Sequence, residues 1–308
     1  MHKFESNGIE IAYEVHGDLS SPAVVGVMGL VEGAKLWPAP LVDVVVEAGF
    51  CFVGFDNRDI GLSTHMSRAG PPDVAAARDA LARGVLPKVP YTLHDLAADT
   101  VALIDGLGIG PVHLIGYSMG GYVAQSVAAR HPDRTRSLLA LMTSSRDPAL
   151  SPLPDHVRDA TVGLTEHVDQ ATTTQRLMEL EGMTSGSRYP TSLRERRAFA
   201  DTVMATNFDP DAVGRQLLAI FGTEPFAEEL ARISVPTTVA HSTEDCFFEI
   251  DHGEDLARRI PGARLEVLEG AGHNFAESLM PKLSRIVVEH LLRTPPHPGL
   301  RTPPHPTG

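Results

Sequence analysis

The chain has 308 residues, 43% of them hydrophobic, so it can bury a large core and form one large domain or a domain carrying an insertion. Its 26 basic and 39 acidic residues leave a net charge of -13, which argues against binding to nucleic acid or to an anionic membrane surface. No apolar run in the sequence approaches the roughly 18 residues that a membrane span needs.

The first six residues lack the apolar core and small-residue cleavage site of a secretory signal, so the expected location is the cytoplasm. Cys51 and Cys246 are the only cysteines. Two are too few for a disulfide framework, and they fit free thiols in a reducing compartment.

The first part of the chain alternates predicted strands and helices. Residues 9–15 alternate apolar and polar side chains after an Asn7-Gly8 turn, which predicts a half-exposed antiparallel strand at the edge of a sheet. Short, nearly continuous apolar runs, typical of parallel strands buried on both faces, occupy residues 23–28, 51–55, 112–115 and 137–142. Residues 93–104 carry an apolar stripe at helical spacing, which ends at Gly106 and Gly108. This alternation predicts an α/β fold with a doubly wound, mostly parallel sheet.

The alternation is lost from about Arg146 to Arg232, where helical patches rich in Thr, Arg and Glu are interrupted by prolines. Strand and helix patterns resume at residues 237–240, 252–260, 265–268 and 279–292. We therefore predict a core of residues 1–145 and 233–292, with residues 146–232 inserted as a helical cap, or lid. The sequence Arg-Thr-Pro-Pro-His-Pro occurs twice after residue 292, so residues 293–308 are predicted to form a polyproline II or unstructured tail.

A serine stands at a predicted junction of strand and helix. Ser118 lies in the sequence Gly116-Tyr117-Ser118-Met119-Gly120, between an apolar run and the helix-like stretch 122–130. Glycines two residues before and after the serine would allow strand and helix to close into a sharp elbow that presents the hydroxyl. The pattern alone also fits an ordinary Gly/Ser-rich turn.

A serine nucleophile needs an imidazole to take its proton and a carboxylate to orient that imidazole. Asp245 follows the predicted strand 237–240, and His273 lies on a glycine-flanked loop after the next strand. The carboxyl ends of parallel strands share one rim, so Ser118, Asp245 and His273 can converge there. Asp245 could instead cap the following segment, with Glu244 or Asp251 as the acid, and His273 could be an ordinary loop histidine.

Main-chain N–H groups are the expected donors to an oxyanion formed at this serine. Met119 directly follows the serine, and Leu30 follows Gly29 at the end of an early strand. The same turn could be only a strand exit. The sequence has no His-Glu-x-x-His motif, and neither cysteine has a partner at ligand spacing, so no metal or organic cofactor is implied.

These features together resemble the α/β-hydrolase family over nearly the whole chain except the tail. Segment 56–63, with Leu36-Trp37-Pro38 before it, is similar to the branch that includes aclacinomycin methylesterase and related small esterases. The resemblance implies an eight-stranded core with a helical cap, a cofactor-free triad and ester hydrolysis through an acyl-enzyme. Met28 stands where many relatives have a histidine before the oxyanion glycine.

The leading hypothesis is a carboxylesterase acting on small or medium apolar substrates. Ser118 would attack, His273 would shuttle the proton, Asp245 would orient His273, and the Leu30 and Met119 N–H groups would hold the oxyanion. Alternatives are a cofactor-free perhydrolase or haloperoxidase-like enzyme, a C–C bond hydrolase on the same triad, or a hydrolase-like receptor for a small molecule. The expected partner is a small-molecule ester, not nucleic acid or membrane.

Two further expectations concern the surroundings of the triad. In segment 56–63, Asp56 is expected to fix the turn and Arg58 to bond carbonyl groups. About a third of the larger apolar cap residues are expected to line an apolar substrate pocket. Those residues are Met178, Met183, Phe199, Met204, Phe208, Phe221 and Phe226.

Overall fold

A computed structural model describes residues 1–294 of the chain. Eight strands form one sheet in the order β1-β2-β4-β3-β5-β6-β7-β8. Strand β2 runs antiparallel to both of its neighbours, and all other neighbouring strands are parallel, which confirms the predicted mostly parallel sheet. The strands are β1 (His2–Ser6), β2 (Ile9–His16), β3 (Ala23–Val27), β4 (Cys51–Phe55), β5 (Val112–Tyr117), β6 (Thr135–Leu141), β7 (Thr237–Ser242) and β8 (Arg264–Leu268).

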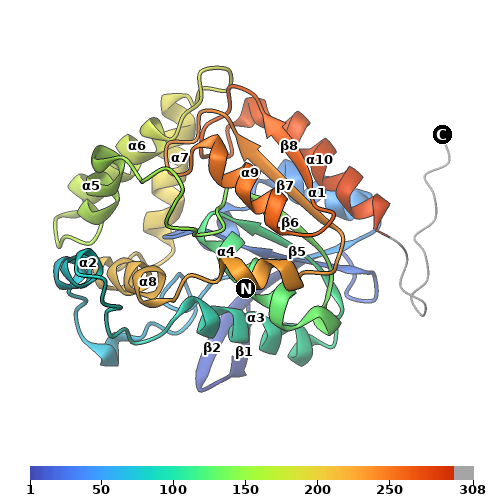
Figure 1. The fold of residues 1–308 in the computed structure, drawn as a ribbon, viewed down its shortest axis with the longest axis horizontal. Helices are drawn as coiled ribbons and strands as arrows, with labels where there is room; N and C mark the ends of the chain where they lie inside the picture. The colour runs from blue at the N-terminus through green and yellow to red at the C-terminus, as the bar shows by residue number, and fades with distance from the viewer. Residues whose placement is uncertain (295–308) are drawn as a thin grey trace.

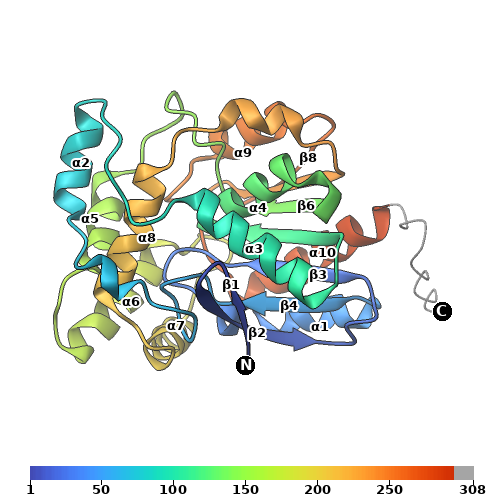
Figure 2. The same cartoon turned by 90° about the horizontal axis from the view of Figure 1, so that it is seen from below.

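Helices cover both faces of this sheet (Figure 1; Figure 2). Helices α1 (Ala39–Glu47) and α10 (Met280–Arg293) pack against each other and bury one face. Helices α3 (Leu93–Leu107), α4 (Met119–Arg130) and α9 (Ile250–Arg259) contribute buried residues to the core on the other face. Successive side chains of a strand point to opposite faces of the sheet. Leu114 of β5 therefore packs on the face covered by α3, α4 and α9, and Ile115 packs on the face covered by α1 and α10.

The expected edge position of residues 9–15 is wrong, because β1 pairs with β2 along its outer side. Asn7 and Gly8 both have positive φ, at 53° and 76°, and turn the chain back on itself. Such a two-residue turn joins adjacent antiparallel strands, so it places residues 2–6 at the edge. Strand β1 has no fully buried residue, and its pattern gave no signal of a strand.

Helix α3 shows how local sequence sets the ends of an element. Thr92 and Asp95 form a capping box at its start. The helix ends at Gly108, which has a φ of 66°, a left-handed conformation that favours glycine. Gly106, predicted to end the helix too, lies inside its last turn. A side chain there would collide with the Phe4 ring of β1.

Between β6 and β7 the chain forms four helices, α5 (Asp155–Gly163), α6 (Gln170–Met183), α7 (Leu193–Ala205) and α8 (Pro210–Gly222). This helical insertion lies at one end of the sheet, at the left of Figure 1. Helix α2 (Val74–Ala82), which follows β4, packs against α8 and extends the cover. Gly214 of α8 allows this contact, since a side chain there would collide with Pro72.

Short 3-10 segments connect these elements: η1 (Ala34–Leu36), η2 (Ser67–Ala69), η3 (Pro132–Arg134), η4 (Ala227–Arg232) and η5 (Glu277–Leu279). None of the helices within residues 1–294 combines the length and the apolar character of a membrane-spanning helix. The predicted proline-rich tail lies outside the described residues, apart from Arg293 and Thr294 at the end of α10.

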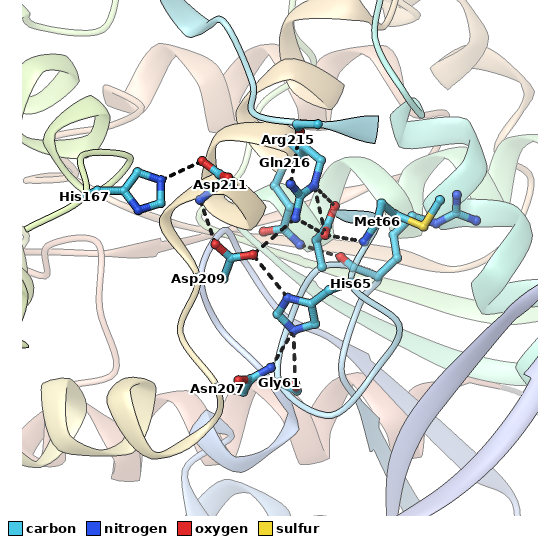
Figure 3. Close-up of polar contacts among 12 residues, drawn as sticks. Gly61, His65, Met66, His167, Asn207, Asp209, Asp211, Arg215 and Gln216 are labelled. Atoms are coloured by element: carbon cyan, nitrogen blue, oxygen red, sulfur yellow. Dashed lines mark hydrogen bonds and ion pairs between the residues drawn. The ribbon is translucent and has the colours of Figure 1, made fainter. Parts of the chain in front are cut away.

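Buried ion pairs join the insertion and segment 56–63 to the sheet core. Arg215 of α8 donates from Nη2 to Asp59 Oδ1 at 2.8 Å, and both side chains are buried. Figure 3 shows Arg215 beside Asp209, whose carboxylate also pairs with His65. Gln216 Nε2, the next residue on α8, donates to the Arg58 carbonyl at 3.1 Å. The insertion is therefore tied to the core by charged and polar contacts.

One of the two expectations for segment 56–63 is confirmed and the other is wrong. Asp56 fixes the turn, because its carboxylate accepts the N–H groups of Ala34 at 2.8 Å and Leu62 at 2.9 Å. Arg58 instead pairs with the Asp99 carboxylate through Nε and Nη2, each at 2.7 Å. A buried guanidinium gains more from a counter-charge than from neutral carbonyls.

Candidate active site

Ser118 lies at the junction of β5 and α4, in a strained backbone conformation with φ 54° and ψ -121°. Such a conformation costs about 1–3 kcal/mol in a non-glycine residue and needs support from its surroundings. The Ser118 N–H donates to the Leu141 carbonyl at 3.0 Å, and the Ser118 carbonyl accepts from Thr143 Oγ1 at 2.8 Å. A side chain on Gly120 would collide with the main chain of Val27, so the elbow requires glycine at that position.

The structure brings Ser118, His273 and Asp245 into one line of hydrogen bonds. His273 Nε2 lies 3.0 Å from Ser118 Oγ, and His273 Nδ1 lies 2.7 Å from Asp245 Oδ2. The three residues lie on loops that follow β5, β8 and β7. Asp245 Oδ1 accepts the N–H groups of Phe247 and Phe248, both at 2.9 Å, which fixes the rotation of the carboxylate. This arrangement can draw the hydroxyl proton toward His273.

The two other candidate acids make contacts elsewhere. Glu244 accepts from the N–H and the Oγ of Ser187, both at 2.6 Å. Asp251 accepts the Ser151 N–H at 2.9 Å. Both carboxylates thus bind segments between β6 and α7, whereas Asp245 faces the imidazole of His273.

The loop that carries His273 is held by the insertion. The His273 N–H donates to the Thr184 carbonyl, at the end of α6, at 2.8 Å. Gly270 has a φ of 70°, whereas Gly272 is needed for space, since a side chain there would collide with the Thr184 carbonyl. The sequence singled out both glycines, but it gave no signal for Thr184, which comes from a segment 89 positions earlier in the chain.

Aromatic rings enclose the His273 imidazole on several sides. Ring centroids of Tyr117, Phe247 and Phe248 lie 5.1, 4.8 and 5.6 Å from that of His273. The Tyr117 hydroxyl donates to the His273 carbonyl at 3.0 Å. These contacts keep the imidazole in one orientation between its two polar neighbours. None of the three aromatic residues was singled out from the sequence.

The structure places the predicted oxyanion donors, Leu30 and Met119, beside the same cavity as Ser118. Both residues line the larger cavity at Ser118. The turn after Leu30 is strained, because Val31 has a φ of 72°, which is rare for a β-branched residue. The Val31 N–H donates to Gln216 Oε1 of α8 at 3.3 Å, so the insertion supports this turn as well.

Two cavities adjoin Ser118. The larger, of about 670 Å³, is mostly apolar and extends between α2, α5 and α8; among its lining residues are Leu30, Met119, Tyr122, Leu217, Ile220, Phe221, Phe247 and Phe248. The smaller, of about 70 Å³, lies on the His273 side.

Of the seven large apolar residues considered in the insertion, Phe221 lines the larger cavity and Phe199 the smaller one. The others pack in the core of the insertion (Met178, Met204, Phe208), pack in the sheet core (Phe226) or are exposed (Met183). The larger cavity owes much of its lining to α2 and to residues 247 and 248, which the sequence did not mark.

Two acidic side chains, Glu32 and Glu181, line the smaller cavity together with Ser118 and His273. Burial, followed by repulsion from Glu181, raises the pKa of Glu32 to about 8. Burial likewise raises the pKa of Glu181 to about 8. No motif in the sequence connects these two residues. Among residues 1–294, no group of three or more His, Cys, Asp or Glu side chains could hold a metal ion.

Comparisons with known proteins agree with this architecture. A family model described as the alpha/beta hydrolase fold matches residues 22–278. The chain is 25% identical over 296 residues to rhodomycin D methylesterase of Streptomyces peucetius, covering 89% of this chain and 92% of that protein. It is 28% identical over 283 residues to a non-heme chloroperoxidase of Kitasatospora aureofaciens, covering 88% and 90%.

Among solved structures, the enol-lactonase from Burkholderia xenovorans LB400 has a similar fold, with a TM-score of 0.72 at 23% identity, covering 95% of this chain and 100% of that one. The family resemblance predicted from the elbow, the oxyanion turn and segment 56–63 is confirmed. Since the family model spans most of the sheet and the entire helical insertion, this chain belongs to the α/β-hydrolase family.

Proposed function

We propose that this protein is a serine hydrolase that cleaves carboxylic esters through an acyl-enzyme intermediate. The proposal rests on one observation above all, the continuous line of hydrogen bonds from Ser118 through His273 to Asp245. The name of the rhodomycin D methylesterase relative, which refers to ester cleavage, points in the same direction.

In the proposed reaction, Ser118 Oγ attacks the ester carbonyl as His273 Nε2 takes its proton, and Asp245 stabilises the resulting imidazolium. The main-chain N–H groups of Leu30 and Met119 are the proposed donors to the oxyanion. His273 then gives its proton to the departing alcohol. Water, deprotonated by His273, attacks the acyl-enzyme, releases the acid and restores Ser118.

The larger cavity supports an apolar substrate of medium size. Its volume of about 670 Å³ lies within the range of roughly 300–1,000 Å³ that is common for small-molecule sites. Its lining by Met119, Phe221 and Phe248 favours an aliphatic or aromatic acyl or alcohol group. We therefore expect the bulk of the ester to lie there.

Replacement of the proposed nucleophile tests this function. Ser118→Ala should lower hydrolysis of short- and medium-chain nitrophenyl esters by several orders of magnitude, up to about a millionfold as in other triad knockouts. Ser20→Ala, the same change on an exposed loop, serves as the control and should keep the wild-type rate. An unchanged rate in Ser118→Ala, with normal folding by circular dichroism, would remove Ser118 from the mechanism.

A second candidate is perhydrolysis or haloperoxidase-like chemistry on the same triad, and the similarity to a chloroperoxidase favours it. Product analysis with an ester, with and without added peroxide, separates peracid formation from hydrolysis; a diketone in the same panel tests C–C cleavage. A receptor role would follow if the wild-type protein bound a ligand tightly yet turned over none of these compounds.

A further inference from the structure

The carboxyl group of Glu32 and the side chain of Ser118 face the same small space. A methyl carbon built on Gly29 would lie 3.2 Å from Glu32 Oε2 and also 3.2 Å from Ser118 Cβ. Gly29 therefore keeps the space between them clear. Glu32 Oε2 is inaccessible to solvent and has no hydrogen-bond partner among residues 1–294. The Glu32 side chain lines the smaller cavity beside Ser118 and His273.

The groups around Glu32 come from several elements, and residues 1–294 place no counter-ion beside it; a hydrogen bond from the Gly29 main chain lowers its pKa against the larger effect of burial. Tyr117 of β5 and His273 line the same cavity, as does Glu181 of α6. The charged groups of α7 act on Glu181 rather than on Glu32: Arg196 lowers the pKa of Glu181, and Glu195 raises it. The strongest influence of a neighbouring charge on Glu32 is thus repulsion from Glu181.

Protons can reach the two carboxyl groups through a neighbouring cavity, although Glu32 Oε2 itself is covered. Glu32 and Glu181 line a second cavity of about 210 Å³, which extends toward Glu195 and Glu277. Both glutamates therefore lie between the space at Ser118 and this outer cavity. Water entering the outer cavity can exchange protons with the pair, so its protonation follows the pH of the solution.

The position of Glu32 has opposite consequences in its two protonation states. A carboxylate this close to Ser118 would repel the oxyanion that forms during ester hydrolysis. A neutral carboxylic acid would instead donate a hydrogen bond to a substrate oxygen in the small cavity, as buried protonated carboxyl groups do in other enzymes. Burial raises the pKa of Glu32 to about 8, so the neutral form prevails at pH 7.

Building on the proposed function, we propose that Glu32 is a specificity-determining residue that, as a neutral acid, donates a hydrogen bond to an oxygen on the smaller substituent of the ester. The class of substrate that this favours is an apolar ester whose small substituent is uncharged and carries a hydrogen-bond acceptor. Glu181 is a positioning residue that keeps the proton on Glu32. The small cavity, at about 70 Å³, limits this substituent to a few atoms.

The pH dependence of hydrolysis tests the proton requirement. In the wild-type protein, kcat/KM should fall about thirtyfold between about pH 7 and about pH 9.5, because only the protonated form turns over. Glu32→Gln keeps a donor that cannot ionise, so it should retain activity at pH 7 and lose this alkaline decline. Glu181→Gln removes the repulsion and should move the decline to lower pH. Glu179→Gln, on the exposed side of the same helix, should keep the wild-type profile.

A matched pair of substrates tests the hydrogen bond itself. A 2-hydroxyethyl ester and a propyl ester of the same apolar acid differ in one hydroxyl group at nearly equal size. The wild-type protein and Glu32→Gln should prefer the hydroxyethyl ester by about tenfold in kcat/KM, and Glu32→Leu should lose the preference. Three results would overturn the proposal. The first is an alkaline decline of kcat/KM in Glu32→Gln equal to that of the wild-type protein, and the second is a wild-type kcat/KM that stays constant to about pH 9.5. The third is an unchanged preference of Glu32→Leu for the hydroxyethyl ester.

Infrared spectroscopy of the free protein tests the protonation of Glu32 without any ester being cleaved. The carbonyl stretch of a protonated carboxyl group should be present near neutral pH in the wild-type protein and in Ser118→Ala, and weaker in Glu32→Gln. If the band is found while no ester is cleaved, the hydrolase proposal fails and the neutral Glu32 stands. If the band is absent while esters are cleaved, the proposal for Glu32 fails alone.

Discussion

At the scale of single residues, Asp245 and His273 each make further hydrogen bonds besides the one that joins them. The Asp245 carboxylate uses one oxygen for His273 and the other for the N–H groups of Phe247 and Phe248. The Tyr117 hydroxyl bonds the carbonyl of His273. Because each group is held from two sides, the imidazole can keep its alignment without help from substrate.

Replacement of Asp245 by asparagine removes the negative charge of the side chain but keeps its shape, so it tests the contribution of the charge to activity. Asp245→Asn keeps an oxygen for the N–H groups of residues 247 and 248 but turns an NH₂ group toward His273 Nδ1. The imidazole then carries its proton on Nε2 and cannot accept from Ser118, so kcat should fall about ten-thousandfold with the fold retained. Ester hydrolysis and circular dichroism measure the two effects.

Glu244→Gln is the matched control for that variant, because Glu244 is adjacent in sequence but binds Ser187. Its rate should stay within a few-fold of the wild-type rate. Full activity in Asp245→Asn together with a large loss in Glu244→Gln would transfer the role of the acid to Glu244.

At the scale of elements, helix α8 connects the insertion to segment 56–63. The Arg215 guanidinium also bonds Asp59 through Nε, at 3.1 and 3.0 Å to its two oxygens. Arg215 is 1% exposed and Asp59 is 1% exposed, so loss of Arg215 leaves the Asp59 carboxylate buried without its counter-charge. The same helix supports the turn at Leu30 and Val31 through Gln216.

Loss of the Arg215 side chain should therefore be costly. Arg215→Ala is expected to lower the free energy of unfolding by about 3–5 kcal/mol, as is usual when one partner of a buried pair is removed. Arg197→Ala breaks an exposed pair with Asp201 on α7 and should cost no more than about 1 kcal/mol. Urea unfolding of both variants measures the difference. Equal losses in the free energy of unfolding would show that the buried Arg215 pair stabilises the fold no more than the exposed Arg197 pair.

At the scale of the whole molecule, a buried polar chain crosses the core far from Ser118. Ser137 Oγ of β6 contacts His113 Nδ1 of β5 at 2.7 Å and His290 Nε2 of α10 at 2.8 Å. His290 Nδ1 contacts Thr238 Oγ1 of β7 at 2.9 Å. Burial lowers the pKa of His113 to about 3 and that of His290 to about 4. Three strands and one helix thus share a network that is stable only while both histidines are neutral.

This network should make the fold sensitive to acid. Below a pH of about 6.5 a histidine binds a proton in the unfolded chain but stays neutral in the folded protein. The free energy of unfolding therefore decreases as the pH falls from about 6.5 toward the pKa of that histidine in the folded protein. His290 should account for a loss of about 3 kcal/mol between about pH 6.5 and about pH 4.

Chemical unfolding at several pH values tests this expectation. His290→Gln cannot take up the proton, so the gap in stability between it and the wild-type protein should narrow by about that amount on acidification. His156→Gln, an exposed control on α5, should follow the wild-type curve. A constant gap between wild type and His290→Gln would refute the role of His290 in acid sensitivity.

Much of the fold could be predicted because its signals are local. Continuous apolar runs marked strands buried on both faces, the apolar stripe of residues 93–104 marked α3, and the glycines around Ser118 marked the elbow. Strand β1 was missed because its exposed residues follow no burial pattern. The contact of Arg58 was misjudged because the position of Asp99 depends on how α3 packs beside the loop.

The sequence by itself determined the alternation of strands and helices, and it led to the proposal of Ser118, Asp245 and His273 as a triad, since their position after strand ends follows from local pattern. Only the tertiary structure decided what surrounds them: Thr184 against the His273 loop, Gln216 against the turn at Val31, and Glu32 beside Ser118. These neighbours lie on segments brought together by packing of the helical insertion, and no short-range pattern encodes which side chains meet across such an interface.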